Sequence, residues 1–478
     1  MKNWSGTRVL IIGAARQGQA LARWLTRHGA RVTLNDLRPL DEMRAVQQSL
    51  IDVDVEWVLG GHPQELLERV DLVCPSGGVP LTLPIVADAI QRGIPLSNDT
   101  QIFLEAAPCK TIGITGSAGK TTATTLVGEM AKLSFKDESG KMKDEASIHA
   151  QRSSFILHPS VFVGGNIGDP LINYVDEMTP DSLAILEVSS FQLEQMTLSP
   201  NIAAVLNVTP NHLDRHGTMQ AYTAAKARLL DFQNAGDIAI LNHDDAGSWG
   251  LRDHVRGDLR AFSLRPLDPA LSGSCLDGNL LSLRGGAMST ALLAREKIQL
   301  RGEHNLSNVL AAFAIGAAAG LSVDAMRIAA ESFRGVAHRL ELVRELHGVR
   351  WYNDSIATAP ERTMAAICSF DEPIVLLLGG RDKDLPWDDL AQLVHQRVQH
   401  VVLFGEAAEK IEAALGPLAG VTRTQVRCET LQAAVTQAAQ VARRGDVVLL
   451  SPGGTSYDAF KDFAERGEKF KSWVAELS

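Results

Sequence analysis

Short apolar runs alternate with amphipathic stretches along nearly the whole chain. The first unit is an apolar run at Arg8–Gly13, a helical pattern at Gly18–His28 closed by Gly29, and a second run at Ala30–Asn35. Continuous apolar runs of this length are typical of parallel strands buried on both faces, and the intervening helix completes a β-α-β unit. The pattern therefore predicts an α/β protein.

The alternation of strand and helix patterns occurs in three successive regions of the chain. Its 478 residues are too many for a single hydrophobic core, which is limited to domains of about 250–300 residues. We therefore predict a Rossmann-like domain over residues 1–108, a central P-loop mononucleotide-binding domain over 109–335 and a second Rossmann-like domain over 336–478. Short strands between Ala261 and Arg301 are expected to pack beside the central sheet. A charged stretch with few periodic apolar positions, residues 134–154, is interpreted as an exposed insertion.

The clearest chemical signal follows the apolar run Thr111–Thr115. Glycines there let the backbone turn its N–H groups inward, and the helix that begins is positive at that end. The strict phosphate-loop pattern needs a glycine where Ile114 stands, so this loop is a shortened variant. A plain strand-to-helix connection is the alternative. We expect ATP to contact Gly116, Ser117, Ala118, Gly119, Lys120, Thr121 and Thr122.

Composition narrows the class of protein. With 45% hydrophobic and 21% charged residues the chain is expected to be globular, and its net charge of −10 argues against a nucleic-acid partner. Five scattered cysteines indicate a reducing compartment, and no signal segment opens the sequence, so we expect a cytoplasmic protein. The longest nearly uncharged stretch, Asn308–Ala325, predicts a buried helix and no membrane span.

The first domain carries a weaker nucleotide signal. Asp36 follows the first glycine by the spacing at which Rossmann-type folds place a carboxylate on a ribose or base. Ala15 stands where the middle glycine of the dinucleotide fingerprint belongs, beside Gly13 and Gly18. A nucleotide-type pocket is therefore predicted, without a dinucleotide.

Several constellations together resemble one family, the Mur ligases, which are ATP-dependent amide ligases of peptidoglycan precursor synthesis. The central ones are Gly164–Gly168, Glu187–Gln192, Asn207–His216 and Ala224–Lys226. The resemblance covers the whole chain, and its later part is similar to the members that add glutamate to UDP-N-acetylmuramoyl-L-alanine. That part comprises Gly302–Asn308, His338–Glu341, Asn353–Ser355 and Leu450–Gly467.

The resemblance implies a two-step reaction. Such ligases phosphorylate the substrate carboxyl with ATP, which gives an acyl phosphate and ADP. An amine then attacks the acyl phosphate and displaces phosphate. The implied catalytic residues are Lys120, Glu187, His212 and Lys226. The implied Mg²⁺ ligands are Thr121, Glu187, His212 and Lys226, the last after carbamylation by CO₂. By themselves, His212 would be a core or surface histidine and Lys226 a solvated helix cation.

The resemblance also implies the binding residues. For ATP these include Asn305 at the adenine, with Arg339 and Asp354 reaching it from the third domain as that domain closes. For the UDP-sugar they are Asp36, Arg38, Ser76, Gly77 and Asn166. For glutamate they are Thr358, Lys383, Ser456 and Phe463, although Lys383 could equally be a solvated turn lysine.

One motif departs from the family pattern. Where the family reads Asp-Ser-Lys-Ala-Thr-Asn, this chain has Ile356 and Ala359 in place of the lysine and the asparagine. The sequence Asp-Ser-Ile-Ala-Thr resembles that of a subgroup of the family that adds L-glutamate, with a separate epimerase acting afterwards. Together with the insertion at 134–154, this resemblance favours L-glutamate as the acceptor. D-glutamate is the alternative. We expect a monomer.

Three other classes share parts of this pattern. A folylpolyglutamate synthase-like ligase carries the same loop but would bind folate in place of a UDP-sugar. A P-loop nucleotide kinase would release no phosphate in response to glutamate. A nucleotide-binding regulatory module would form no ADP with any substrate.

Overall fold

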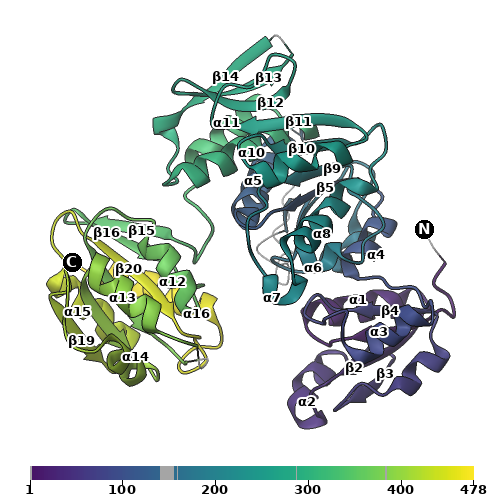
Figure 1. Cartoon of the computed structure of the whole chain (residues 1–478), viewed down its shortest axis with the longest axis horizontal. Helices are drawn as coiled ribbons and strands as arrows, with labels where there is room; N and C mark the ends of the chain where they lie inside the picture. The colour runs from purple at the N-terminus through teal and green to yellow at the C-terminus, as the bar shows by residue number, and fades with distance from the viewer. Residues whose placement is uncertain (1–2, 140–155, 159, 287, 383–384) are drawn as a thin grey trace. The chain divides into compact units, whose positions relative to one another are not determined.

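The structure, a computed structural model, describes residues 3–139, 156–158, 160–286, 288–382 and 385–478. The chain forms two compact units, each with parallel strands covered by helices (Figure 1). The first unit extends to Gln299 and includes Glu303–Phe333, and the second holds Leu300–Gly302 and Arg334–Ser478. The α/β prediction is confirmed, while the proposed domain boundaries remain predictions.

The first unit begins with a four-stranded parallel sheet in the order β3-β2-β1-β4. Its strands are β1 (Arg8–Ile12), β2 (Arg31–Asp36), β3 (Val55–Leu59) and β4 (Leu72–Pro75). The helices beside it are α1 (Arg16–Arg27), α2 (Leu40–Ser49), α3 (Pro84–Gln91) and α4 (Asp99–Ala106). The predicted β-α-β unit is therefore present, with its carboxyl edge at Gly13 and Asp36.

A ten-stranded sheet follows, in the order β14-β13-β12-β11-β10-β9-β5-β8-β7-β6. Its strands are β5 (Lys110–Thr115), β6 (Ile156–His158), β7 (Val161–Gly165), β8 (Leu183–Glu187), β9 (Ile202–Val205), β10 (Ile238–Asn242), β11 (Asp258–Ser263), β12 (Ser272–Asp277), β13 (Leu280–Gly285) and β14 (Met288–Ala294). The expectation that Ala261–Arg301 packs beside the sheet is wrong. Backbone pairing joins β11 to β14 to the sheet itself, in parallel up to β12 and antiparallel beyond.

The described part of this region contains seven helices: α5 (Lys120–Ser139), α6 (Ser190–Leu193), α7 (Leu213–His216), α8 (Met219–Asp231), α9 (Ala246–Trp249), α10 (Glu303–Ala319) and α11 (Val323–Ser332). Helix α5 runs on to Ser139, so the first residues of the predicted insertion are helical. Residues 140–155 lie outside the described part of the chain. The predicted buried helix is α10, whose Leu306–Gly316 portion is mostly buried.

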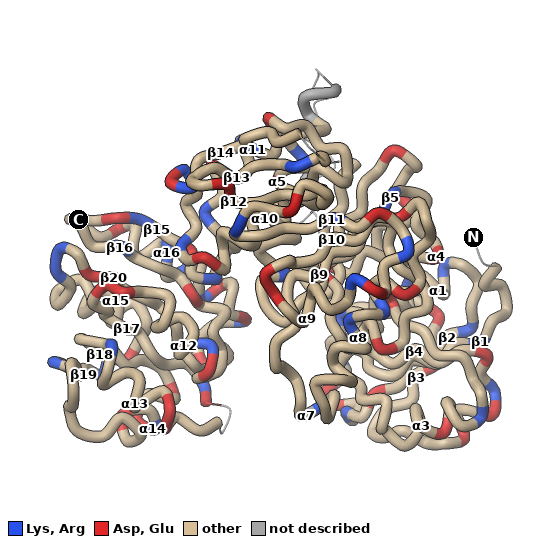
Figure 2. The backbone as a smooth tube through the Cα atoms, turned by 45° about the horizontal axis from the view of Figure 1, so that its top comes forward, with Lys and Arg blue, Asp and Glu red and all other residues tan. Residues whose placement is uncertain are grey.

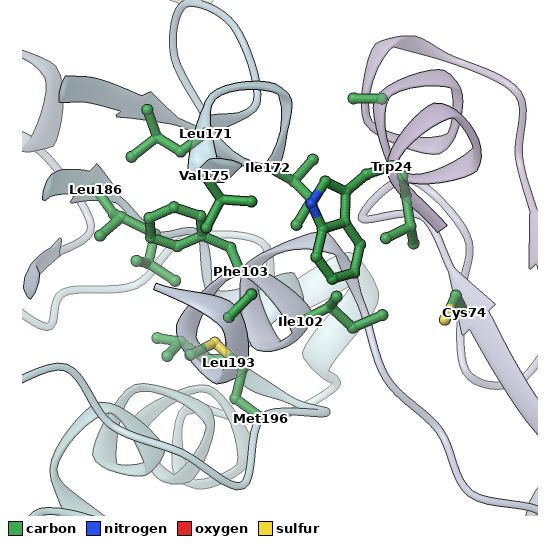
Figure 3. Close-up of a cluster of buried hydrophobic side chains, with 14 of the residues drawn as sticks. Trp24, Cys74, Ile102, Phe103, Leu171, Ile172, Val175, Leu186, Leu193 and Met196 are labelled. Carbon is green, nitrogen blue, oxygen red and sulfur yellow. The ribbon is translucent and has the colours of Figure 1, made fainter. Parts of the chain in front are cut away.

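A continuous apolar cluster joins the small sheet to the large one (Figure 3). Trp24 of α1 and Phe103 of α4 point toward Leu171, Val175 and neighbouring side chains of the central region. The indole Nε1 of Trp24 also donates to Asp176 Oδ1 at 3.1 Å. Burying large aromatic side chains across this junction makes the first two predicted domains one unit.

The second unit contains a six-stranded sheet in the order β15-β16-β20-β17-β18-β19. Its strands are β15 (Glu341–Leu346), β16 (Val349–Asn353), β17 (Ile374–Gly379), β18 (Val398–Phe404), β19 (Thr424–Cys428) and β20 (Val447–Gly453). Its helices are α12 (Pro360–Ile367), α13 (Asp388–Arg397), α14 (Ala408–Leu415), α15 (Leu431–Val441) and α16 (Phe463–Glu476). All pairs are parallel except β15 with β16, so the carboxyl ends of the other strands meet at one edge.

Charge is spread over the whole described chain. Basic and acidic positions are interspersed along the backbone in both units (Figure 2). Among the described helices, none is both long and apolar enough to cross a membrane.

Candidate active site

The phosphate loop lies between β5 and α5, as the sequence predicts. Gly119 has a φ of +82°, and a Cβ added there would lie 2.2 Å from Asn308 Oδ1. Glycine is therefore required twice, by the backbone conformation and by the close approach of α10. Lys120 Nζ donates to the Gly116 carbonyl at 2.8 Å, so the ammonium lies across its own loop.

Residues that follow β9 form hydrogen bonds with this loop. Asn207 Oδ1 accepts from Ala118 N at 2.8 Å, and its Nδ2 donates to the Ala118 carbonyl at 3.1 Å. Ser117 Oγ lies 3.0 Å from the Tyr222 hydroxyl and donates to the Thr209 carbonyl at 2.9 Å. The sequence prediction assigned no role to Asn207 or Tyr222; Asn207 begins the motif Asn207–His216, and Tyr222 lies just before the motif Ala224–Lys226.

Glu187 is a buried carboxylate next to the phosphate loop. It ends β8 and is 2% exposed. Thr121 Oγ1 donates to its Oε2 at 2.8 Å, and Asn166 Nδ2 donates to its Oε1 at 3.0 Å. A buried carboxylate beside a hydroxyl and an amide supplies the hard oxygen ligands that Mg²⁺ prefers, so the residues present fit the ion. Asn166, expected at the UDP-sugar, is engaged here with Glu187.

Lys226 lies on α8 beneath the loop and is 1% exposed. Its Nζ is 3.5 Å from Thr115 Oγ1 and 4.7 Å from the centre of the Tyr222 ring. Within the described residues no carboxylate forms an ion pair with it. Burial, and to a smaller extent the neighbouring charge of Lys120, lowers the pKa of Lys226 to about 7. The prediction of a solvated lysine is excluded.

His212 occupies a different environment. It precedes α7 with a φ of +53°, is exposed, and meets the edge of the Phe191 ring at 5.1 Å between centroids. Over the described ranges, no group of three or more His, Cys, Asp or Glu side chains converges as a metal site. The structure thus brings Thr121 and Glu187 together, while the assignment of His212 to a metal remains a prediction.

The predicted UDP-sugar residues gather at the carboxyl edge of the small sheet. Asp36 Oδ2 accepts from Ala14 N and from Arg38 Nη2, each at 2.8 Å. The hydrogen bonds from Arg38 hold the pKa of the Asp36 carboxyl well below its usual range. Ser76 Oγ donates to the Gly13 carbonyl at 2.8 Å, which brings the turn before Gly77 to the end of β1.

In the second unit, Asp354 lies buried after β16. Ser451 Oγ donates to its Oδ2 at 2.8 Å and Leu340 N to its Oδ1 at 3.2 Å. Burial raises the pKa of Asp354 to about 7, although these hydrogen bonds and the charges of Arg339 and Arg362 oppose the shift. Arg362 had no place in the sequence prediction. It lies within α12 and donates to the Ile356 carbonyl at 3.4 Å, which places a cation near the position where the family has lysine.

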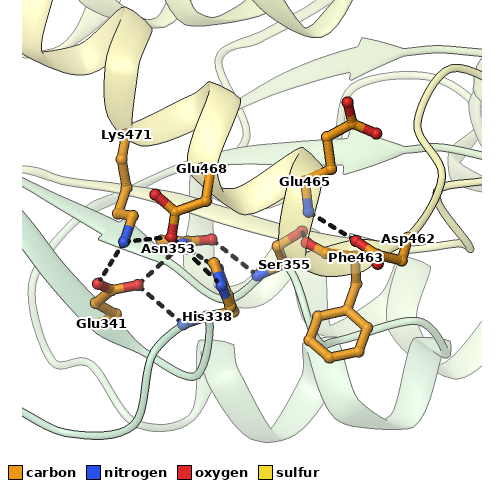
Figure 4. Close-up of polar contacts among 9 residues, drawn as sticks. All are labelled: His338, Glu341, Asn353, Ser355, Asp462, Phe463, Glu465, Glu468 and Lys471. Carbon is orange, nitrogen blue, oxygen red and sulfur yellow. Dashed lines mark hydrogen bonds and ion pairs between the residues drawn. The ribbon is translucent and has the colours of Figure 1, made fainter. Parts of the chain in front are cut away.

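A polar network supports the same strand ends (Figure 4). Glu341 Oε2 accepts from the His338 backbone N–H at 2.8 Å and from Asn353 Nδ2 at 3.0 Å. Ser355 Oγ donates to the Phe463 carbonyl at 2.8 Å. This hydrogen bond connects Phe463, which is predicted to bind the substrate glutamate, to the end of β16. Ser456 is buried in the loop after β20 and Thr358 precedes α12, whereas Lys383 lies outside the described residues.

Comparisons with known proteins define the class. The Mur ligase MurD-like N-terminal domain matches residues 7–98, the Mur ligase middle domain 114–316 and the Mur ligase glutamate ligase domain 338–454. The chain belongs to the Mur ligase family. It is accordingly an ATP- and Mg²⁺-dependent, ADP-forming ligase, and the predictions of ligase activity and of a three-domain Mur architecture are confirmed.

Particular relatives are similar over their full length. The chain is 38% identical to the UDP-N-acetylmuramoylalanine--D-glutamate ligase of Pelotomaculum thermopropionicum, over 100% of this chain and 99% of that protein. It is 38% identical to the protein of the same name from Symbiobacterium thermophilum, over 98% of each. Among solved structures, the UDP-N-acetylmuramate-alanine ligase of Thermotoga maritima shares the fold with a TM-score of 0.54, 17% identity and coverage of 98% and 99%.

Proposed function

We propose that this protein joins D-glutamate to UDP-N-acetylmuramoyl-L-alanine. The observation that supports this most is the match, over the full length of both chains, to relatives named as D-glutamate ligases. Our sequence prediction favoured L-glutamate because of Ile356, but the names of the relatives favour the alternative. With D-glutamate as acceptor, no subsequent epimerase is needed. A cytoplasmic location, a monomeric state and the absence of a nucleic-acid or membrane partner remain predictions from the sequence.

The phosphate loop would carry the first step. ATP supplies the phosphoryl group for the substrate carboxyl, and Mg²⁺ offsets the charge that develops on it. The N–H groups around Gly119 and the ammonium of Lys120 are placed to bind the terminal phosphates. Glu187 and Thr121 would hold the ion, since the hydroxyl already lies 2.8 Å from the carboxylate. Asn305, Arg339 and Asp354 complete the proposed ATP set.

Lys226 fits the carbamylation that the family resemblance implies. Carbamylation requires a neutral amine and yields an anion, and the buried amine of Lys226 lacks a carboxylate partner in the described chain. A carbamate there would place negative charge among Lys120 and the proposed metal ligands. Protein incubated with ¹³C-labelled bicarbonate should show a carbamate signal by NMR that is absent in Lys226→Ala. An identical signal in both proteins, or unchanged activity of Lys226→Ala in bicarbonate-depleted buffer, would contradict the assignment.

The remaining substrate groups would bind at two sheet edges. Asp36, Arg38, Ser76 and Gly77 form the proposed UDP end, where backbone N–H groups and a guanidinium suit phosphates. Asn166, whose Nδ2 donates to Glu187, would join this substrate from the end of β7. Thr358, Lys383, Ser456 and Phe463 form the proposed glutamate pocket in the second unit.

The decisive experiment measures ADP release with UDP-N-acetylmuramoyl-L-alanine and either enantiomer of glutamate. We expect turnover with D-glutamate and little with L-glutamate. Turnover with L-glutamate alone would restore the original stereochemical prediction. Turnover with neither would refute the proposed acceptor while leaving the family assignment in place.

A further inference from the structure

Arg466 is a guanidinium enclosed in the second unit. It lies in the first turn of α16, is 0% exposed, and uses all five of its N–H donors. Its Nε donates to Ser355 Oγ at 3.0 Å, and its Nη2 donates to the carbonyls of Ser355 at 2.9 Å and Gly454 at 3.1 Å. Its Nη1 donates to the carbonyls of Gly454 at 3.1 Å and Thr455 at 2.9 Å.

All of these acceptors are neutral. Among the described residues no carboxylate forms an ion pair with Arg466, and the acidic charge that raises its pKa is that of Asp458. Burial lowers the pKa of Arg466 to about 10, so it remains a cation at neutral pH. A buried cation without an anionic partner costs folding free energy, and such a cost is offset where an anion binds nearby.

The acceptors are the strand ends that carry the proposed glutamate pocket. Ser355 Oγ, which accepts from Arg466, donates in turn to the Phe463 carbonyl at 2.8 Å. Thr455, whose carbonyl Arg466 binds, directly precedes Ser456, and that carbonyl also accepts from Arg381 N at 2.9 Å. Arg466 therefore connects the loops after β16 and β20 to the start of α16, and the Thr455 carbonyl that it binds is shared with the loop after β17.

The guanidinium of Arg466 packs closely against the loop after β17. Gly380 has a φ of +91°, and a Cβ added there would lie 2.8 Å from Arg466 Nη1 and 2.1 Å from the Thr455 carbonyl oxygen. The guanidinium therefore lies against backbone on several sides and cannot itself reach a substrate.

We infer that Arg466 is the positioning residue of the amino-acid pocket and that its unpaired charge gives the pocket its preference for an acidic acceptor. This inference rests on the proposed glutamate ligase function. Two effects are separable: the hydrogen bonds align the loops for any amino acid, whereas the charge favours a side-chain carboxylate over a carboxamide. D-glutamate and D-glutamine, which share size and shape, distinguish them.

The test compares kcat/KM for the two amino acids in Arg466→Gln and Arg466→Lys. Arg466→Gln should lower the glutamate-to-glutamine preference by about tenfold, because the charge is lost. Arg466→Lys should raise KM for both amino acids together and keep the preference within about threefold, because the charge stays. KM for ATP should change less than about twofold in either variant. An unchanged preference in Arg466→Gln, or an equal loss in Arg466→Lys, would overturn the inference.

Arg344 of β15 is a matched control, because it contacts the same helix. Arg344 Nη1 donates to the carbonyls of Val474 and Ala475, each at 3.0 Å, at the opposite end of α16. Arg344→Met should lower the melting temperature without changing the preference, and a change as large as in Arg466→Gln would contradict the inference. Should Arg466→Gln fail to fold, Asp458→Asn removes the opposing charge and should raise the preference by about twofold. An unchanged preference in Asp458→Asn would count against the inference. If wild-type protein used neither amino acid, the proposed function itself would fail.

Discussion

Gly119→Ala tests the fit between the phosphate loop and α10. A non-glycine residue at a φ of +82° costs about 1 kcal/mol. The new Cβ would also lie 2.2 Å from Oδ1 of the buried Asn308, and overpacking of this kind costs about 2 kcal/mol. The total of about 3 kcal/mol predicts a fall of roughly 6 °C in the melting temperature of a unit this large. KM for ATP should rise by about tenfold or more, because the loop N–H groups move.

Gly320→Ala is the matched control. Gly320 has a φ of +83°, and no atom lies within 4 Å of the position that an added Cβ would occupy, so only the backbone penalty applies. The substitution should lower the melting temperature by roughly 2 °C and leave ATP kinetics unchanged. Differential scanning fluorimetry and ADP release measure both variants. Adding Asn308→Ala to Gly119→Ala should recover part of the loss, as a double-mutant cycle would report. Equal effects of Gly119→Ala and Gly320→Ala would refute the reasoning.

Three further variants test other contacts. Asp99 is 6% exposed and burial raises its pKa to about 6. The pKa of an aspartate in the unfolded chain is about 4, so the folded state binds this proton more tightly. The free energy of unfolding should therefore fall by up to about 3 kcal/mol as pH rises from 4 to above 6. Asp99→Asn should therefore raise the melting temperature at pH 8 and not at pH 4, and equal shifts would contradict this. Thr121→Val should weaken Mg²⁺-dependent ADP release by about 10- to 100-fold while Thr121→Ser stays near wild type; similar losses in both would exclude a role for the hydroxyl. Gly467→Ala should destabilise by about 2 kcal/mol, although alanine favours helices, because its Cβ would lie 2.1 Å from His338 Nδ1; a gain in melting temperature would show that this contact relaxes freely.

Much of the site was predictable because its signals are local. The phosphate loop is recognisable from contiguous residues, since glycine spacing, a lysine and a hydroxyl set its chemistry wherever the strand and helix meet. Glu187 was predicted through the family resemblance, and the structure adds that it ends β8 and that Thr121 donates to it. The environment of Lys226 was not predictable from local sequence. The helix pattern alone indicated a solvated lysine, whereas the structure buries Lys226 beneath the phosphate loop.

The long-range contacts were not predictable in the same way. Asn308 approaches Gly119 because α10 packs on α5, and Asn207 braces the loop because β9 lies beside β5. Strand order also decided that Ala261–Arg301 extends the central sheet, since the apolar pattern of an edge strand does not identify its neighbour.

The sequence by itself determined the α/β class, the phosphate loop and the resemblance to a ligase family. Tertiary structure decided which side chains face one another: the Glu187 contacts with Thr121 and Asn166, and the enclosure of Arg466 by carbonyls from the loops around it. The physical reason is that local motifs depend on backbone geometry within a few residues. Burial and pairing of charges depend on segments far apart in the chain that only the packed sheets bring together.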